Sequence, residues 1–316
     1  MSLDFRSSFW AESFPRLTRV DQPLSRLTTL HVGGRALVLT PRSLGDLREI
    51  RLAARERGED LRVLGLGANV IVSDRGVDEP VVSTRQLREC RFEGRRVRAG
   101  AGTLLQSLVS ASARRGLAGL EPLVGIPATV GGAVAMNAGG RYGCTFDRLA
   151  SVSVMRLDGE IEERRPAALE PAYRKTRLGE GEIVVEATFE LEPAAPDAVL
   201  GRTQDVLTEK SARQPLDVWS AGCIFKNPAG GGAPAGRLIE ESGQKGASIG
   251  DAVVSPKHAN FIVNRKNAAA SDVLALVDRV RAVVLERTGV RLELEVLLWD
   301  GEASGLVRAE SVLQPT

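Results

Sequence analysis

The chain has 316 residues, 43% of them hydrophobic, which is enough for two domains with buried cores. Its 42 Lys and Arg residues against 40 Asp and Glu residues leave a net charge of +2, which argues against nucleic acid or a membrane surface as a partner held by bulk charge. Three widely spaced cysteines without a CxxC pair, and only two histidines, argue against a disulfide framework and a metal site and favour the reducing cytoplasm.

No targeting or membrane-spanning segment is expected. The N-terminal sequence MSLDFRSSFWAESF carries charges where a signal peptide needs an unbroken apolar stretch. The longest uncharged run, near Gly125, is interrupted by Pro127, Asn137 and several glycines, which a membrane span would not tolerate in this number. We therefore expect a globular cytoplasmic protein, with a monomer as the default oligomeric state.

The N-terminal part predicts a β-α-β unit after a lead-in segment that ends near Leu24. Short strands are expected at 36–39 and 61–64. Between them, Ser43 is a good helix cap, and the apolar residues that follow share one helical face as far as about Arg57.

The second strand leads into the sequence GLGANVIVSD at 65–74. It contains a GxG pair, but Val70 stands where a dinucleotide-binding fingerprint needs its third glycine, and VIVS favours a strand over a helix. A strand-turn-strand with Gly65, Gly67 and Asn69 could still present backbone amides to a phosphate. The alternative interpretation is a plain tight turn.

Strand-like runs follow near Val81, Arg91 and Arg96. A helix is then expected to begin at Thr103, because Thr103 and Gln106 have the spacing of a capping box, in which each side chain bonds the other residue's backbone N–H.

The stretch GIPATVGGAVAMNAGGRYG at 125–143 is the part of the chain that an ordinary core explains least well. It carries no charge before Arg141 and contains the glycine pairs 131–132 and 139–140, where a backbone turns sharply or lies close to another group. Its amides could form a phosphate-binding nest, and Ile126 could contact a flat ring. The alternative is a buried glycine-rich loop packed on a sheet.

The rest of the chain alternates strands and helices, which places the protein in the α+β class. Beyond the glycine-rich stretch, strands are expected at 150–156, 160–163, 183–191, 221–226, 253–263 and 291–299. Helices are expected at 197–213, at 236–241 and from Ser271 to Gly289. Pro193 and Pro196 indicate a domain boundary, and the polar residues beyond Gly301 are expected to form a loose tail.

Six motifs between 24 and 299 together resemble, in the correct order, the UDP-N-acetylenolpyruvoylglucosamine reductase family. They are GLGANVIVSD, GIPATVGGAVAMNAGG, the pair Tyr173–Arg174, AGCIFKNP at 221–228, SPKHANFIVN at 255–264 and LELEV at 292–296.

The resemblance implies a vanillyl-alcohol-oxidase-type FAD-binding fold followed by a substrate-binding lobe. The implied parts are FAD-binding subdomains at 1–83 and 84–195, a substrate-binding domain at 196–302 and the tail at 303–316. FAD would be held without a covalent bond, and the implied FAD-binding residues are Gly65, Gly67, Ala68, Asn69, Val70, Gly125, Ile126, Pro127, Ala128, Thr129, Gly131, Gly132, Asn137 and Gly139.

The family takes a hydride from NADPH onto FAD and passes it to the enolpyruvyl methylene carbon of UDP-N-acetylglucosamine enolpyruvate, giving UDP-N-acetylmuramate for peptidoglycan. Hydride addition beside a carboxylate builds up negative charge that needs cations or hydrogen-bond donors. The matching residues imply Arg174 as a fork for the substrate carboxylate and Glu295 as a donor to the developing charge. Glu293 faces the same way on a period-two strand and stays an alternative to Glu295.

The third implied catalytic residue is the proton donor, a serine in much of the family and Cys223 here. A thiol is more acidic than an alcohol, so the chemistry is retained, although Cys223 could instead be a small packing residue. Lys226, Asn227 and His258 are implied substrate-binding residues, each with a structural role as the alternative.

Two further features depart from the family pattern. The only tyrosines are Tyr142 and Tyr173, so the chain is similar to the shorter subtype without a tyrosine-bearing insertion. MNAGGRYG also has one residue more than the commoner MNAGAYG. Two other functions stay open: an FAD-dependent oxidase of the same superfamily, and a non-catalytic flavin- or nucleotide-binding protein.

Overall fold

The computed structural model describes residues 5–300, so the predicted tail beyond Gly301 lies outside the described residues. The chain folds into two compact units, each built from three segments. Unit 1 comprises the chain up to Val20, Leu37–Leu66 and Glu79–Ala212, and unit 2 comprises Asp21–Ala36, Gly67–Asp78 and the chain from Arg213. The helices are α1 (Phe5–Ser13), α2 (Leu44–Arg57), α3 (Leu105–Arg114), α4 (Val130–Ala135), α5 (Pro196–Arg213), α6 (Ala235–Glu241) and α7 (Ala270–Thr288).

The predicted β-α-β unit is confirmed. It belongs to a sheet of order β1-β2-β5-β3, in which β5 pairs in parallel with β2 and with β3. The strands are β1 (Thr18–Pro23), β2 (Arg35–Leu39), β3 (Arg62–Leu64) and β5 (Val81–Ser83). Helix α2 begins where predicted, because Ser43 Oγ accepts the Asp46 N–H at 3.0 Å, and it ends at Gly58 with φ +63°. Its buried face, Leu47, Ile50 and Ala54, packs with Trp10.

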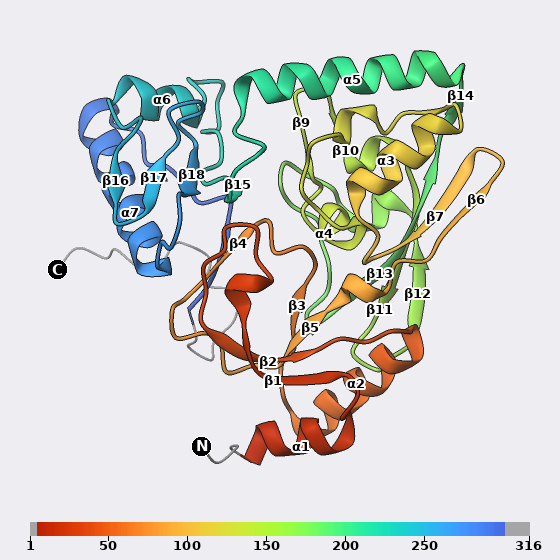
Figure 1. The fold of residues 1–316 in the computed structure, drawn as a ribbon. Coiled ribbons are helices and arrows are strands. Elements are labelled where there is room, and N and C mark those ends of the chain that lie inside the picture. Colours follow the sequence, from red (N-terminus) through yellow and green to blue (C-terminus); the bar gives the residue numbers. More distant parts are fainter. Residues whose placement is uncertain (1–4, 301–316) are drawn as a thin grey trace. The chain divides into compact units, whose positions relative to one another are not determined.

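A second sheet of unit 1 is antiparallel, with order β12-β11-β13-β7-β6 (Figure 1). Its strands are β6 (Cys90–Glu93), β7 (Arg96–Gly100), β11 (Leu149–Met155), β12 (Ile161–Arg164) and β13 (Ile183–Glu190). Helix α4 packs against β13 and β7, and Leu105, Leu108 and Val109 of α3 belong to the same core as Phe189. This core supports the glycine-rich stretch.

The predicted capping box at the start of α3 is wrong. The helix begins at Leu105, the Thr103 hydroxyl is buried without a hydrogen-bond partner, and Gln106 Oε1 instead accepts the Gly125 N–H at 3.0 Å. The Leu105 N–H donates to Ala128 O at 2.9 Å. The 125–128 segment therefore takes over the capping interactions, which no local pattern could predict.

The glycine-rich stretch is also not a loop throughout, because it contains α4. Thr129 is the N-cap of this helix, with its Oγ1 accepting the Gly132 N–H at 3.4 Å. Four strands of two residues form two antiparallel pairs. Strand β9 (Gly139–Gly140) pairs with β10 (Gly143–Cys144), and β8 (Leu117–Ala118) pairs with β14 (Glu192–Pro193).

Unit 2 contains an antiparallel sheet of order β15-β18-β17-β16 and the parallel pair β4-β19. Its strands are β4 (Val70–Val72), β15 (Ser220–Cys223), β16 (Ser248–Ile249), β17 (Ala252–Val254), β18 (Phe261–Asn264) and β19 (Leu297–Trp299). Helix α7 packs on β16, β17 and α6 (Figure 1). It buries an apolar stripe that includes Val273, Leu276 and Val280. It ends at Gly289, as predicted, with φ +70°.

Helix α7 begins one residue earlier than predicted, because a distant carboxylate caps it. Asp74 Oδ1 accepts the Ala270 N–H at 2.7 Å and Asp74 Oδ2 accepts the Ser271 N–H at 2.9 Å. Burial acts to raise the pKa of Asp74, but the hydrogen bonds from Ser271 and Ala270 outweigh it and hold that pKa below the usual value.

Three further expectations need correction or qualification. The lead-in segment before Leu24 contains α1 and β1. The last predicted strand is confined to β19, because Leu294 makes only an isolated bridge with Phe225. Residues 196–212 belong to unit 1 of the structure, although the predicted substrate-binding domain begins at residue 196. The predicted division into two FAD-binding subdomains and a substrate-binding domain stays a prediction. Among residues 5–300, no helix combines the length and apolar character that crossing a membrane needs.

Candidate active site

In unit 1, the structure brings the start of the first predicted cofactor loop against the second. A side chain added at Gly65 would place its Cβ 2.4 Å from Thr129 Oγ1. The Arg85 guanidinium holds the same turn, donating to Gly65 O at 2.9 Å and to Leu66 O at 3.0 Å. Glycine is required at 65 by this close approach within the protein.

The glycines of 125–143 serve different purposes. A Cβ at Gly131 would lie 2.8 Å from Ala101 Cβ, and one at Gly139 would lie 2.5 Å from Cys144 Cα, so both are required by internal packing. Gly132 is exposed, and its Cβ would meet only Thr129 Oγ1, at 3.5 Å. Nothing among residues 5–300 therefore explains glycine at 132, and an external group lying against the start of α4 would.

The expectation that this stretch forms a nest of phosphate-binding amides is not supported. The N–H groups of Val130 and Gly131 donate to Thr103 O at 2.8 Å and Ala101 O at 2.9 Å. Those of Gly125, Ile126 and Ala128 also have protein acceptors, which are Gln106 Oε1, Leu123 O and Ile126 O. The stretch offers apolar contact surface more than amides.

In unit 2, by contrast, the backbone amides of the turn at 67–69 are available to bind a ligand. Across the described part of the chain, the N–H groups of Gly67, Ala68 and Asn69 have no hydrogen-bond acceptor. The turn is held in shape by its own contacts: Asn69 Nδ2 donates to Glu295 O at 3.1 Å, and Gly67, at φ +68°, accepts the Thr29 N–H at 3.1 Å. Three successive free amides on a fixed turn suit a phosphate.

In unit 1, the side-chain oxygen of Asn137 is a further polar atom without a hydrogen-bond partner. Its backbone has the left-handed φ of +41°, and its Nδ2 donates to Ala172 O at 3.1 Å. Its Oδ1 is buried and accepts no hydrogen bond. A buried acceptor without a partner is uncommon, and a ligand N–H group would satisfy it.

Arg174 lies beside this segment, half-buried, with its Nη1 donating to Gly139 O at 2.7 Å. Its backbone has φ +55°, which is strained for a residue with a side chain and is typical of functional sites. The guanidinium also lies 5.3 Å from the centre of the exposed Tyr173 ring. The structure therefore brings Arg174 together with the implied flavin-binding residues of unit 1.

Sequence reasoning missed Lys210, the buried lysine of α5. Its Nζ donates to Pro122 O at 2.7 Å and Val124 O at 2.8 Å. Burial, with Arg174 adding a smaller repulsion, lowers the pKa of Lys210 to about 8. The signal was its position three helical turns from Val199, the other buried residue of α5.

The implied catalytic residues of unit 2 lie on adjacent backbone segments. The Glu295 N–H donates to Ile224 O at 2.8 Å, so Glu295 pairs with the residue that follows Cys223. The pairing of β15 with β18 is irregular between Ser220 and Cys223, with Gly222 at φ +76°. Such a bulge turns a side chain out of the regular alternation, and Cys223 is half-buried.

The structure distinguishes Glu295 from the alternative Glu293. The Glu293 side chain is 74% exposed and lies near Lys226, with Nζ to Oε2 at 3.5 Å. Glu295 is half-buried. A carboxylic acid that acts as a hydrogen-bond donor near neutral pH needs such burial, which favours Glu295.

Asn227 and His258 both have structural contacts. Asn227 Oδ1 accepts the N–H of Ala235, the first residue of α6, at 3.1 Å. His258 Nδ1 accepts the Asn260 N–H at 3.3 Å, and burial, followed by the charge of Lys245, lowers the pKa of His258. His258 is therefore neutral near pH 7, and Lys245, which sequence reasoning did not select, is a second cation of this region.

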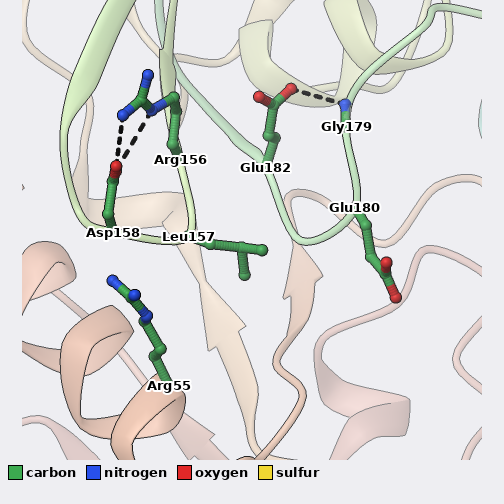
Figure 2. Close-up of a pocket in the computed structure, with 7 residues that line it drawn as sticks. All are labelled: Arg55, Arg156, Leu157, Asp158, Gly179, Glu180 and Glu182. Atoms are coloured by element: carbon green, nitrogen blue, oxygen red, sulfur yellow. Dashed lines mark hydrogen bonds and ion pairs between the residues drawn. The ribbon is translucent and has the colours of Figure 1, made fainter.

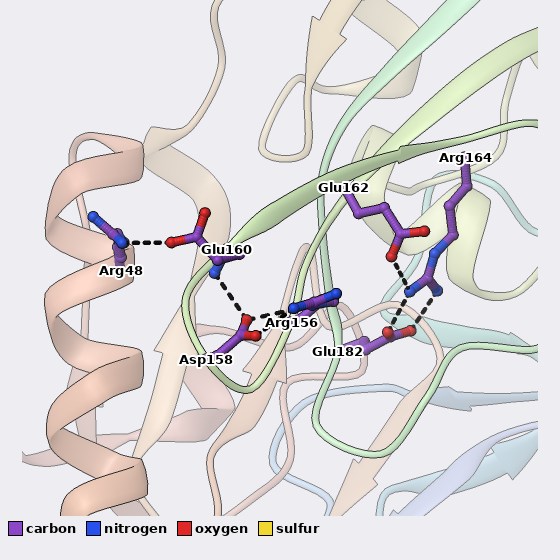
Figure 3. Close-up of polar contacts among 7 residues, drawn as sticks. All are labelled: Arg48, Arg156, Asp158, Glu160, Glu162, Arg164 and Glu182. Atoms are coloured by element: carbon purple, nitrogen blue, oxygen red, sulfur yellow. Dashed lines mark hydrogen bonds and ion pairs between the residues drawn. The ribbon is translucent and has the colours of Figure 1, made fainter.

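A cavity of about 440 Å³ elsewhere in unit 1 contains none of the predicted site residues. Figure 2 shows its lining, which includes Arg55, Asp158 and Glu182. Three of its charged residues are paired, as Figure 3 shows: Arg156 with Asp158, and Glu182 with the nearby Arg164, which also pairs with Glu162. The pairing with Arg156 lowers the pKa of Asp158 to about 2. We interpret this cavity as a solvated ionic surface.

Comparison with known proteins matches both parts of the chain. The family described as the UDP-N-acetylenolpyruvoylglucosamine reductase C-terminal domain matches residues 214–299, and the FAD binding domain family matches residues 35–164. The UDP-N-acetylenolpyruvoylglucosamine reductase of Moorella thermoacetica is 45% identical, over 88% of this chain and 92% of its own. That of Geobacter metallireducens is 44% identical, over 87% and 92%. The crystal structure of the Thermus caldophilus enzyme is 43% identical, with a TM-score of 0.78, and the match covers 89% of this chain and 99% of that one.

Proposed function

The chain belongs to the UDP-N-acetylenolpyruvoylglucosamine reductase family, and on that premise we propose that it reduces UDP-N-acetylglucosamine enolpyruvate to UDP-N-acetylmuramate with NADPH as hydride donor. It is an FAD-dependent oxidoreductase of peptidoglycan precursor synthesis. Within the chain, the observation that carries the proposal is the pairing of half-buried Glu295 with the segment that carries Cys223. An acid and a thiol on adjacent backbone segments suit the protonation of the carbon next to the one that has just received a hydride.

The described residues fit FAD. The free amides of Gly67, Ala68 and Asn69 would hold its pyrophosphate, and the buried Asn137 Oδ1 would accept a hydrogen bond from a ring N–H. The open surface at Gly132 would lie against the ring system. When bound, FAD would supply the hydride-transfer chemistry, between NADPH and the methylene carbon of the enolpyruvyl group.

The chain's own residues then stabilise and protonate the substrate. Arg174, a planar fork, would bind the substrate carboxylate with two hydrogen bonds. Glu295, in its protonated form, would donate to the oxygen on which negative charge develops. The Cys223 thiol would give its proton to the carbon that bears the ether oxygen, which completes the reduction of the double bond.

For the remainder of the substrate, a UDP-sugar, the cations of unit 2 are the proposed ligands. Lys226 is 40% exposed and could move from Glu293 to a phosphate. Lys245, paired with Glu240 at 2.7 Å, and neutral His258 would add a charge and a hydrogen-bonding ring. Asn227 is already bonded to Ala235 and would contribute through its amide N–H₂. We take a cytoplasmic monomer as the working assumption.

The proposed reaction is tested with purified protein and defined substrates. The protein should be yellow, should release all its flavin on denaturation, and should oxidise NADPH rapidly only when UDP-N-acetylglucosamine enolpyruvate is present. The product should be UDP-N-acetylmuramate by mass spectrometry. A colourless protein that takes up no FAD would refute the proposal. Rapid oxygen consumption without the enolpyruvyl substrate, or covalently retained flavin, would indicate an oxidase instead.

A matched pair of glycine variants tests the position of FAD on α4. Gly132→Ala should fold with unchanged or slightly higher stability, because its Cβ meets nothing closer than 3.5 Å and alanine favours a helix over glycine. FAD affinity, measured by quenching of flavin fluorescence, should nevertheless fall by about tenfold, since a methyl group would displace the ring.

Gly131→Ala is the control, because its Cβ would lie 2.8 Å from Ala101 Cβ. It should lower the free energy of unfolding by about 1–3 kcal/mol through overpacking. If Gly132→Ala bound FAD as tightly as the wild type, the flavin would not lie against α4.

A further inference from the structure

Lys210 is a charged residue on the buried face of a mostly exposed helix. Its relative exposure is 9%, and the only other buried residue of α5 is Val199. The Lys210 ammonium donates to Pro122 O and Val124 O at 2.7 and 2.8 Å. Burying an ammonium is costly, so the chain retains it here against a substantial desolvation penalty.

The two carbonyls end the turn that leads into the glycine-rich stretch. Leu123 and Val124 are fully or almost fully buried, and Val124 is followed directly by Gly125, whose N–H is bonded to Gln106. The direction in which the chain enters 125–129 is therefore set by where the carbonyls of Pro122 and Val124 point. Without Lys210, Val124 O would face a buried space with no donor among the described residues.

A second cation of α5 holds the same turn in a different way. Arg202, two turns before Lys210, bonds Glu121 Oε1 at 2.9 Å through its Nη2 and at 3.1 Å through its Nε. That contact is made to a side chain at the start of the turn, and Arg202 is half exposed. Both residues therefore attach α5 to this turn, but only Lys210 orients the carbonyls of Pro122 and Val124.

We propose that Lys210 is a positioning residue for FAD: its ammonium fixes the carbonyls of Pro122 and Val124 and thereby holds 125–129 in the conformation that receives the flavin. The inference rests on the proposed function, because it takes 125–129 as part of the FAD site. Lys210 acts through the backbone of the turn and needs no contact with the substrate.

The surroundings of Lys210 make this role depend on pH. The Lys210 Nζ lies 5.7 Å from the centre of the Tyr142 ring, and the positive charge of Arg174 repels it. The neighbouring Arg141 and Glu209 form an ion pair with no net charge. Because its pKa is lowered to about 8, Lys210 loses its charge as the pH rises through that value. The charge-assisted bonds to both carbonyls then become weaker neutral ones.

FAD titration of the apoprotein at pH 7 and pH 9.5, followed by flavin fluorescence, tests the proposal. Lys210→Met should raise the dissociation constant for FAD at pH 7 by about tenfold or more, whereas Arg202→Met should lower the unfolding temperature and leave FAD affinity within about twofold. Equal effects of both variants on FAD affinity would show that Lys210 only attaches α5, and would overturn the proposal.

Lys210→Arg gives the decisive pH comparison, even if the methionine variant does not fold. Arginine keeps the charge and the donors at pH 9.5, so FAD affinity should stay constant in this variant while it falls several-fold in the wild type. Parallel pH profiles would refute the inference. If the wild type binds FAD and Gly132→Ala weakens it as expected, a normal Lys210→Met refutes only the role of Lys210 and leaves the proposed function intact.

Discussion

Arg174→Lys should slow reoxidation of the reduced flavin by the enolpyruvyl substrate by about 10²- to 10³-fold, while reduction of the flavin by NADPH stays within about threefold of the wild type. Lysine keeps the positive charge but loses the planar fork, so the substrate carboxylate loses a bidentate partner as charge develops next to it. Stopped-flow absorbance of the flavin measures the two half-reactions separately. The left-handed backbone at position 174 is equally strained with lysine, so the substitution changes only the head group.

Arg177 provides the matched control on the same segment. It forms an exposed pair with Glu170, at side-chain exposures of 71% and 61%. Arg177→Lys should leave both half-reactions and the unfolding temperature unchanged, since exposed ion pairs contribute little. Equal slowing of both half-reactions in Arg174→Lys would mean that Arg174 supports the flavin through Gly139 O and does not bind the substrate carboxylate.

Elements whose ends are set locally were predicted from the sequence. Helix α2 begins at the Ser43 cap and ends at Gly58, and α7 ends at Gly289, because a side-chain cap and a left-handed glycine act within one turn of the helix. The predicted start of α3 was wrong because the groups that cap this helix are distant in the sequence. The Gly125 N–H captures Gln106 and Ala128 O satisfies the Leu105 N–H, and both groups come from about 20 residues away.

The candidate site was predictable to the extent that its residues form recognisable motifs. Arg174, Cys223 and Glu295 were identified by similarity to the family. The glycines stay predicted FAD-binding residues, and the structure adds a reason for two of them, because a Cβ at Gly65 would clash with Thr129 and one at Gly131 would clash with Ala101.

Lys210 and Lys245 carry no motif of their own. Lys210 faces two backbone carbonyls, and Lys245 lies near enough to His258 to lower the pKa of that imidazole. Such roles depend on tertiary distances, and local patterns do not encode them. The sequence signal that could have identified Lys210 is its spacing of three helical turns from Val199, which places both residues on one face of α5.

Cys223→Ala should let NADPH reduce the flavin at the wild-type rate, yet slow reoxidation by the enolpyruvyl substrate by about 10²- to 10⁴-fold, the usual effect of losing a positioned general acid. Cys223→Ser should retain substantial activity, because a hydroxyl can occupy the same bulge of β15 and donate a proton. The comparison separates chemistry from packing, since alanine and serine differ little in volume at a half-buried site.

Cys90→Ala is the control for the loss of a thiol, because Cys90 is an exposed residue of the strand β6 and should be replaceable without effect. In D₂O, the wild type should place one deuterium at the carbon that bears the ether oxygen, on one face only, as NMR of the product would show. The alanine variant should lose rate, and random stereochemistry at that carbon would indicate that water has replaced the thiol. If Cys223→Ala turned over like the wild type, Cys223 would be a packing residue, and a bound water held by Glu295 would be the next candidate for the proton donor.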